Sequence, residues 1–162
     1  WSGKVVCTGT QTKNAARLAL RKFVRMVRSV DLEVGMYNFE IQNVVASAKL
    51  SHLVNLAVLC EHCGACASYE PELFPGMVYR PDNSHIVFLI FSSGRTVITG
   101  AKNENEVGIA FKRMKRLFAT FGESIVATSA SEGRGCKNRD LTMVLAHPSV
   151  VKGSVEGVSA LR

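Results

Sequence analysis

The chain has 162 residues, of which 47% are hydrophobic and 20% are charged, so it can form one or two small domains with a buried core. The formal net charge of +7 favours a polyanionic partner such as nucleic acid. No apolar run reaches the roughly 18 residues of a membrane span, so we expect no membrane partner. The five cysteines lack the spacing of a secreted disulfide framework, which favours a reducing intracellular setting.

The N-terminal end is predicted to form a short strand and a long helix. Lys4–Thr8 alternates so that Lys4, Val6 and Thr8 share one face of the strand. Thr12–Val30 has apolar residues at helical spacing. They predict a core-facing stripe of Ala16, Ala19, Leu20, Phe23, Val27 and Val30.

The opposite side of this helix is basic. Its cations are Lys13, Arg17, Arg21, Arg25 and Arg28. Such a face is about as often simply solvated as it is a docking surface for an acidic partner or for flanking DNA. Both interpretations stay open at this point.

A β-rich run, Tyr37–Ala48, contains an amide in its middle. Asn43 is unusual there, because strands favour β-branched and aromatic residues. One interpretation is an exposed polar position. The other is a contact with the minor groove of DNA, since an amide both donates and accepts hydrogen bonds.

The segment Leu50–His62 is predicted to be a buried helix, because its apolar residues leave little polar face. Its end carries possible ligands for zinc or an iron–sulfur cluster: Cys60, His62, Cys63 and Cys66. A closed zinc site normally needs a second ligand pair about 12 or more residues away, and the downstream His85 and Cys136 are isolated. We therefore predict half-buried thiols, with no bound metal or other cofactor.

An exposed acidic turn at Tyr69–Leu73 precedes a predicted sheet. Three β-rich runs follow, with turn residues between them: Glu72–Arg80, His85–Phe91 and Arg95–Thr99. Phe74 opens the strand expected within the first run, and Phe91 closes the second strand. If these strands pair antiparallel, the two rings lie side by side at one end of the sheet, as core or as an exposed wedge.

An internal repeat links the two ends of this region. Ser2–Gly9 matches Ser93–Gly100, and each copy runs into a basic helix-patterned segment. The second helix, Asn103–Phe121, begins with Asn103 and Glu106 at capping-box spacing. Two copies of one α+β unit are predicted.

The repeat predicts three divisions of the chain. Residues 1–33 are the end of a first copy, whose beginning would precede Trp1, and residues 34–121 are a second copy. Residues 122–162 lack aromatic residues and are rich in Gly and Ser, which predicts a partly flexible extension outside the domain. Within it, Leu141–Ala146 and Val150–Val158 have some strand character.

Four segments, in order and spacing, resemble the TATA-box-binding protein family: Ile41–Val45, Ser68–Gly76, Leu89–Gly94 and Thr99–Lys102. The resemblance covers roughly residues 2–121, and a divergent member or a related factor fits best. It implies an α+β saddle of two pseudo-symmetric repeats, a curved antiparallel sheet with helices on the convex face. Here the first repeat is truncated at its N-terminal side.

The resemblance also implies a DNA-binding face and a non-enzymatic function in transcription initiation in the nucleus. An apolar face with one amide, Thr hydroxyls and marginal cations suits the minor groove of AT-rich promoter DNA, and the two Phe rings would be a wedge that bends it. Without the resemblance, core packing of these rings is favoured. The predicted DNA-binding residues are Lys4, Val6, Thr8, Asn43, Val45, Phe74, Pro75, Arg80, Leu89, Phe91, Ser93, Arg95, Val97 and Thr99.

The family's partners suggest two further surfaces. The acidic turn is where factor IIB-type initiation factors bind, which selects Glu70, Glu72 and Leu73. The first basic helix, with Arg17, Arg21 and Arg25, becomes a candidate surface for an acidic protein such as a factor IIA-type initiation factor.

Two competing functions remain. The first is a protein-interaction platform in a transcription complex with weak or no TATA specificity. The second is an enzymatic function, either through a thiol site at Cys60, His62 or Cys63 or as the accessory domain of a DNA-repair enzyme. It is disfavoured because the sequence offers no paired carboxylates or lysine–aspartate constellation to support catalysis.

Overall fold

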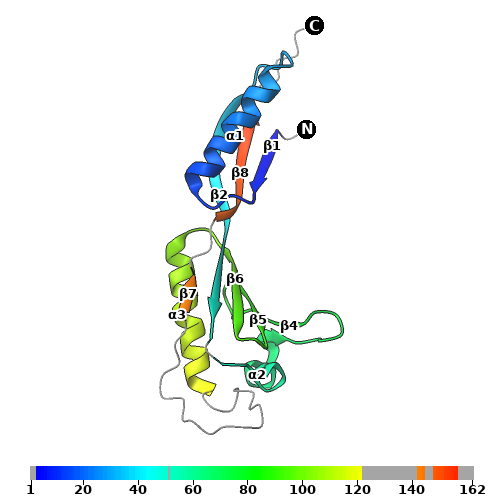
Figure 1. Cartoon of the computed structure of the whole chain (residues 1–162), viewed down its shortest axis with the longest axis vertical. Helices are drawn as coiled ribbons and strands as arrows, with labels where there is room; N and C mark the ends of the chain where they lie inside the picture. The colour runs from blue at the N-terminus through cyan, green and yellow to red at the C-terminus, as the bar shows by residue number, and fades with distance from the viewer. Residues whose placement is uncertain (1–2, 51, 122–141, 145–147, 157–162) are drawn as a thin grey trace. The chain divides into compact units, whose positions relative to one another are not determined.

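The computed structural model describes residues 3–50, 52–121, 142–144 and 148–156. Figure 1 shows the helices and strands coloured in chain order from blue to red. In chain order they are β1 (Lys4–Thr8), α1 (Lys13–Arg28), β2 (Gly35–Lys49), α2 (Leu56–Cys63), the 3-10 helix η1 (Gly64–Cys66), β3 (Ala67–Ser68), β4 (Gly76–Tyr79), β5 (Val87–Phe91), β6 (Arg95–Ala101), α3 (Glu104–Phe121), β7 (Thr142–Val144) and β8 (Pro148–Glu156).

The chain forms two compact units. Unit 1 comprises Trp1–Val44 and Ala146–Arg162, and unit 2 comprises Val45–Leu145. The long strand β2 contributes its first part to unit 1 and its last residues to unit 2. The compact units therefore divide inside β2, whereas the sequence repeat suggests a division between residues 33 and 34.

Unit 1 is a small antiparallel sheet with one helix packed on it. Its strand order is β1, β8, β2, and α1 packs against β1 and β8 (Figure 1). Ala16 and Leu20 of α1 form the centre of the core, against Val5 and Cys7 of β1. The helix begins after the N-cap Thr12, whose hydroxyl accepts from the Ala15 N–H at 3.1 Å.

The predicted core stripe of α1 is partly wrong. Ala16 and Leu20 are buried, and so is Val24, which was not in the predicted stripe. Phe23 and Val30 lie exposed instead. The unit presents one small sheet to the helix, so only the residues directly above the strands are covered.

The C-terminal segment takes part in the fold, although the sequence predicts an extension outside the domain. Strand β8 lies between β1 and β2 and pairs antiparallel with both. Strand β7 pairs with the last residues of β2, opposite Ser47 to Lys49. The strand character expected near Leu141–Ala146 and Val150–Val158 is thus confirmed for the described residues. The flexibility expected elsewhere in this segment concerns residues that lie outside the described ranges.

Unit 2 is a larger sheet covered on one face by helices. From the end of β2 its strand order is β6, β5, β4, β3. Helix α3 packs against β6, and α2 packs against β3 and β4. The core between sheet and helices contains the buried side chains Met77, Phe88, Ile90, Ile98, Val107, Ala110, Met114 and Phe118, together with Leu56 and Leu59 of α2.

The predicted buried helix at Leu50–His62 begins later than expected. Helix α2 starts at Leu56, after the N-cap Asn55. The preceding residues bind the β5–β6 turn instead: the Leu50 N–H donates to Gly94 O at 3.0 Å, and the Val54 N–H donates to Ser92 O at 2.9 Å. Leu50 and Val54 are therefore buried outside a helix, whereas Leu53 is 50% exposed.

The internal repeat is confirmed by backbone geometry. Gly3 and Gly9 flank β1 with φ of 62° and 82°, and Gly94 and Gly100 occupy the matching positions around β6 with φ of 78° and 96°. Only glycine adopts this left-handed region without strain. Each copy is therefore a turn, a strand and a second turn that leads into a long helix.

The start of α3 is held by the predicted cap. Asn103 Oδ1 accepts from the Glu106 N–H at 2.9 Å, and the Asn103 amide donates to Glu106 Oε1 at 2.7 Å. Glu106 Oε2 also accepts from the Lys102 N–H and contacts His85 Nε2 at 3.0 Å. The Lys102 N–H, together with His85, lowers the pKa of the Glu106 carboxyl below its usual value.

Candidate nucleic-acid interface

The two predicted wedge residues lie side by side at one end of the unit 2 sheet. The Phe74 and Phe91 ring centroids are 5.8 Å apart, and the rings meet edge to face at 62°. Phe74 is 37% exposed and Phe91 is half-buried, so the pair is not in the closed core. The expectation that antiparallel pairing brings the rings together is confirmed.

Gly76 explains how the two rings can meet. It pairs with Phe91 across β4 and β5. A Cβ atom at Gly76 would lie 2.8 Å from Phe74 Cε1 and 3.0 Å from Phe91 Cε1. The rings therefore occupy the space that any other residue would fill at this position.

Strict alternation separates the two faces of this sheet. In β5, Phe88 and Ile90 are buried beneath the helices, whereas Val87, Leu89 and Phe91 are half-exposed. The same alternation holds in β6 and in the last residues of β2. The predicted residues that share the half-exposed face of these strands are Val45, Leu89, Phe91, Arg95, Val97 and Thr99.

The remaining predicted residues of unit 2 lie at the margins of this face. Pro75 precedes β4, and Ser93 lies in the β5–β6 turn. Arg80 is exposed just past β4, where its N–H donates to Cys66 O at 2.7 Å.

A hollow of about 520 Å³ lies against Phe91 at the end of the sheet. Its lining residues are Lys49, Pro75, Phe91, Ser92, Ser93 and Arg95. Lys49 and Ser92 are not among the residues predicted from the sequence. Lys49 could have been found from the sequence, because it lies four residues after Val45 in the same strand and therefore shares the face of Val45. Val78 is also missing from the prediction and lies opposite Leu89 in register.

In unit 1, the predicted residues of β1 lie on the face away from α1. Lys4, Val6 and Thr8 are exposed, and Val6 remains 50% exposed despite being apolar. Asn43 lies half-buried in β2. Strand β8 separates β1 from β2, and its Val150 is in register with both Thr8 and Asn43. The sequence indicates strand character near Val150–Val158 but not that this strand lies between β1 and β2.

The predicted partner residues of the acidic turn project from unit 2. Backbone hydrogen bonds from the Leu73 and Phe74 N–H groups to Glu70 O, at 3.0 and 2.9 Å, close the turn. Glu70 and Glu72 are exposed, and Leu73 is 81% exposed.

The basic face of α1 is exposed as predicted, but its members differ. Arg21 and Arg25 are exposed. The Arg17 guanidinium lies 4.9 Å from the centroid of the Phe39 ring, a cation–π arrangement. Arg28 donates through Nε to Val34 O at 2.7 Å. Arg21 and Arg25 are therefore more available to a partner than Arg17 or Arg28.

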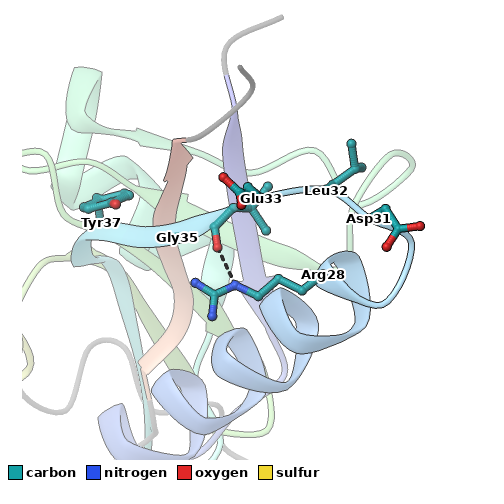
Figure 2. A pocket seen from close by; sticks show the side chains of 7 residues that line it. Arg28, Asp31, Leu32, Glu33, Gly35 and Tyr37 are labelled. Carbon is teal, nitrogen blue, oxygen red and sulfur yellow. Dashed lines mark hydrogen bonds between the residues drawn. The ribbon is translucent and has the colours of Figure 1, made fainter. Parts of the chain in front are cut away.

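Arg28 also lines a second hollow, of about 700 Å³, between the end of α1 and the start of β2 (Figure 2). The carboxylates of Asp31 and Glu33 and the ring of Tyr37 surround it as well. The mixture of one cation with two carboxylates gives this hollow no clear preference for an anion or a cation.

Cys63, in the cysteine cluster at the end of α2, lacks the lowered thiol pKa of a reactive cysteine. Burial, with the nearby Cys60 and Cys66, raises the pKa of the Cys63 thiol to about 11, so little thiolate forms at neutral pH. Cys66 Sγ donates to Asp82 Oδ1 at 3.4 Å. Within the described ranges, no group of three or more His, Cys, Asp or Glu side chains is arranged to hold a metal ion.

His62 of the same segment packs against a ring. It stacks on Phe121 with centroids 4.7 Å apart.

In the part of the chain that the structure describes, no helix has both the length and the apolar character needed to cross a membrane.

Comparison with known proteins identifies the family of this chain. The family model described as "Transcription factor TFIID (or TATA-binding protein, TBP)" matches residues 38–121. TATA box-binding protein-like 2 of Rattus norvegicus is 43% identical over 120 residues, which are 74% of this chain and 35% of that protein. TATA-box-binding protein 1 of Triticum aestivum is 41% identical over 123 residues, which are 76% of this chain and 53% of that protein.

A solved structure supports the same assignment. Methanococcus jannaschii TBP matches with a TM-score of 0.61 and 35% identity, over 72% of this chain and 69% of that one. The chain spans only about a third to a half of the length of the two curated relatives described above. The α+β fold and the matched sequence together show that this chain belongs to the TATA-binding protein family.

Proposed function

We propose that this protein binds duplex promoter DNA through the half-exposed face of its strands and acts in the nucleus as a non-enzymatic transcription initiation factor. Family membership supports this role, because the curated relatives are named as TATA-box-binding proteins. The observation that carries the proposal is the partly exposed pair of Phe74 and Phe91, which meet beside Gly76 at the end of the sheet.

The composition of the unit 2 face suits an opened minor groove. Val45, Leu89 and Val97 are apolar but only half-buried, and Thr99 adds a hydroxyl among them. The floor of a minor groove is mostly sugar and base edge with few hydrogen-bonding groups, so an apolar face can close on it. The preference is for A·T pairs, because they lack the guanine amino group and because TA steps deform easily.

The ring pair is proposed to act as a wedge. Phe74 and Phe91 insert at one base step, which costs on the order of a few kcal/mol in lost stacking and bends the duplex, a mechanism for which the TATA-binding protein is the standard example. Pro75 stiffens the chain next to Phe74. Ser93, Arg95 and Arg80 lie at the margin, where contacts to phosphates set register and affinity.

Unit 1 is proposed to contribute its own DNA contacts. Val6 and Thr8 offer an exposed apolar and hydroxyl surface on β1, with Lys4 at its end. Asn43 on β2 can donate to and accept from groove acceptors and donors.

Family membership and two exposed surfaces support a proposal for two protein partners. We propose that a factor IIB-type initiation factor binds Glu70, Glu72 and Leu73, since this turn combines two carboxylates with an 81% exposed leucine. We propose that the basic face of α1, including Arg17, Arg21 and Arg25, binds an acidic protein such as a factor IIA-type initiation factor.

One observation bears on the alternative of a protein-interaction platform with weak TATA specificity. Glu40 is exposed on β2 in unit 1, and its register partner on β8 is Lys152, which is also the register partner of Val6. A carboxylate near the proposed DNA contacts of this unit repels phosphate and lowers affinity. The platform function is therefore the second candidate.

The test is a duplex with donor and acceptor dyes at its two ends and a central TATAAA, titrated with the intact protein. Energy transfer should rise on binding, and Phe74→Ala/Phe91→Ala should lose that rise. Phe23→Ala is a matched control, because Phe23 is 40% exposed on α1, close to the 37% of Phe74.

Three outcomes separate the functions. A rise that the double variant loses and Phe23→Ala keeps supports the bending factor. Binding without bending, unchanged in the double variant, favours the platform. An absence of DNA binding by the intact protein would overturn the proposal.

A further inference from the structure

Lys49 lies next to the ring pair, at a position that the proposed DNA-binding set does not include. It is the last residue of β2, and it lines the hollow against Phe91 together with Arg95. The hydroxyl-bearing Ser92 and Ser93 line the same hollow. The described lining thus offers two cations, two hydroxyls and one aromatic wall, with no carboxylate among them.

The backbone at Lys49 is fixed on both sides. The next residue, Leu50, donates its N–H to Gly94 O at 3.0 Å, which ties the end of β2 to the β5–β6 turn. On the other side, Lys49 pairs in register with Thr142 of β7. Because side chains alternate along β2 and Ala46 and Ala48 are buried, the Lys49 side chain leaves the sheet on the half-exposed face.

The charge of this hollow differs from that of the hollow in unit 1. There, Arg28 is accompanied by Asp31 and Glu33, so the local charges oppose one another. Here, neither Lys49 nor Arg95 forms an ion pair with another described residue. Two cations that no described carboxylate pairs with, beside hydroxyl donors, are suited to an anion such as a phosphate.

We propose that Lys49, beside Arg95, binds phosphates of the DNA backbone where the strand passes the Phe74–Phe91 pair. This inference rests on the proposed function. A duplex that opens over an inserted ring pair brings its backbone past the margin of the sheet, and the hollow lies at that margin. The phosphate contacts supply affinity and position the rings, without reading base sequence.

The experiment measures affinity against salt concentration for the intact protein and for Lys49→Gln, using the TATAAA duplex and a G·C-rich duplex. Each phosphate contact contributes about 0.9 to the slope of log K against log salt. Lys49→Gln should lower the slope by about 1 and weaken binding to both duplexes by the same factor. Energy transfer at saturation should stay unchanged, since the rings are intact.

Two variants control for net charge and chemistry. Lys115→Gln removes the same charge from an exposed position of α3, whose buried face packs on the opposite side of the sheet, and should leave the slope unchanged. Lys49→Arg should retain the slope of the intact protein. In an Arg95→Gln background, Lys49→Gln should lower the slope by about 1 again, because the two cations make separate contacts.

The outcomes separate this inference from the proposed function. If the intact protein binds and bends DNA but Lys49→Gln matches Lys115→Gln, the phosphate site is wrong and the function stands. A loss confined to the TATAAA duplex also overturns the site, because phosphate contacts carry no sequence preference. If the intact protein does not bind DNA, the proposed function itself fails.

Discussion

Units 1 and 2 contain the same turn–strand–helix element but complete it in different ways. In unit 2, the helix α3 follows β6 and buries Val107, Ala110, Met114 and Phe118. The sheet continues from β6 through β5, β4 and β3, and these three strands directly precede β6 in the chain. In unit 1, α1 follows β1, but the strand between β1 and β2 is β8, from the far end of the chain.

This difference shows that the turn–strand–helix element does not by itself determine which strands complete its sheet. The unpaired N–H and C=O groups at the edge of a strand can pair with the backbone of another strand, so distant chain segments can complete a sheet. Local pairing in unit 2 costs little loop entropy, whereas the pairing of β8 in unit 1 closes a long loop. Unit 1 should therefore be the less stable of the two, and it depends on β8.

The largest expected effect comes from breaking the pairing of β8. Val151 lies opposite Cys7 of β1 and Ile41 of β2, so Val151→Pro removes an N–H from a strand paired on both sides. We expect a loss of about 2 to 3 kcal/mol in unfolding free energy. Hydrogen exchange should accelerate in β1 and α1 while β5 and β6 stay protected.

The matched control for this change is Val151→Thr, which keeps the N–H and the β-branched shape. It should leave the protection of α1 nearly unchanged. Equal protection of α1 in the proline variant and the intact protein would show that β8 is not needed to hold unit 1 together.

A second prediction concerns the ring pair of unit 2. A Cβ at Gly76 meets both Phe74 and Phe91, so Gly76→Ala pushes the rings apart at a cost of about 1 kcal/mol. Energy transfer on binding the TATAAA duplex should fall below that of the intact protein. Gly108→Ala on α3, where a Cβ meets nothing within 4 Å, should instead stabilise by about 1 kcal/mol. Full bending by Gly76→Ala would contradict the wedge geometry.

The core of unit 2 contains one polar defect that offers a smaller test. Thr96 is fully buried, and its Oγ1 has no hydrogen-bond partner among the described residues. Thr96→Val removes this unpaired hydroxyl, and we expect a gain of up to about 1 kcal/mol by urea denaturation. Thr120→Val should bring no such gain, because the Thr120 hydroxyl donates to Arg116 O at 2.9 Å. Destabilisation by Thr96→Val would mean that the hydroxyl is satisfied in solution.

The smallest effect is expected from acidification of unit 2. The pKa of Glu106 is lowered in the fold, so its bonds to Lys102 and His85 stabilise the protein above the usual carboxyl pKa of 4.5. That contribution is lost as pH falls through the lower folded pKa. We expect less than about 1 kcal/mol, since the pair is exposed. Below pH 4.5, Glu106→Gln should reduce the pH dependence of the free energy of unfolding. If that pH dependence is the same in the variant and the intact protein, the Glu106 carboxylate does not contribute to stability in this way.

Several features of the fold were predictable because they are local. The glycines around β1 and β6 mark left-handed turns that few other residues tolerate. The Asn103–Glu106 cap follows from a spacing of three residues. The meeting of Phe74 and Phe91 follows from antiparallel pairing of neighbouring strands. The DNA and partner roles of these residues stay predictions until binding is measured.

Other features were missed because they depend on distant contacts. The apolar pattern of α1 allowed Phe23 and Val30 in the core, but the sheet of unit 1 reaches only Ala16, Leu20 and Val24. The helix expected from Leu50 is delayed to Leu56, because the preceding backbone binds the β5–β6 turn.

The sequence by itself determined the repeated turn–strand–helix element, the family and the faces of the strands, because periodicity, caps and left-handed glycines act within a few residues. Only the tertiary structure decided that β8 lies between β1 and β2 and that Lys49 lies beside Phe91. Both depend on strand pairing across long stretches of chain. The backbone hydrogen bonds of such pairs are the same for every residue type, so the sequence records them only weakly.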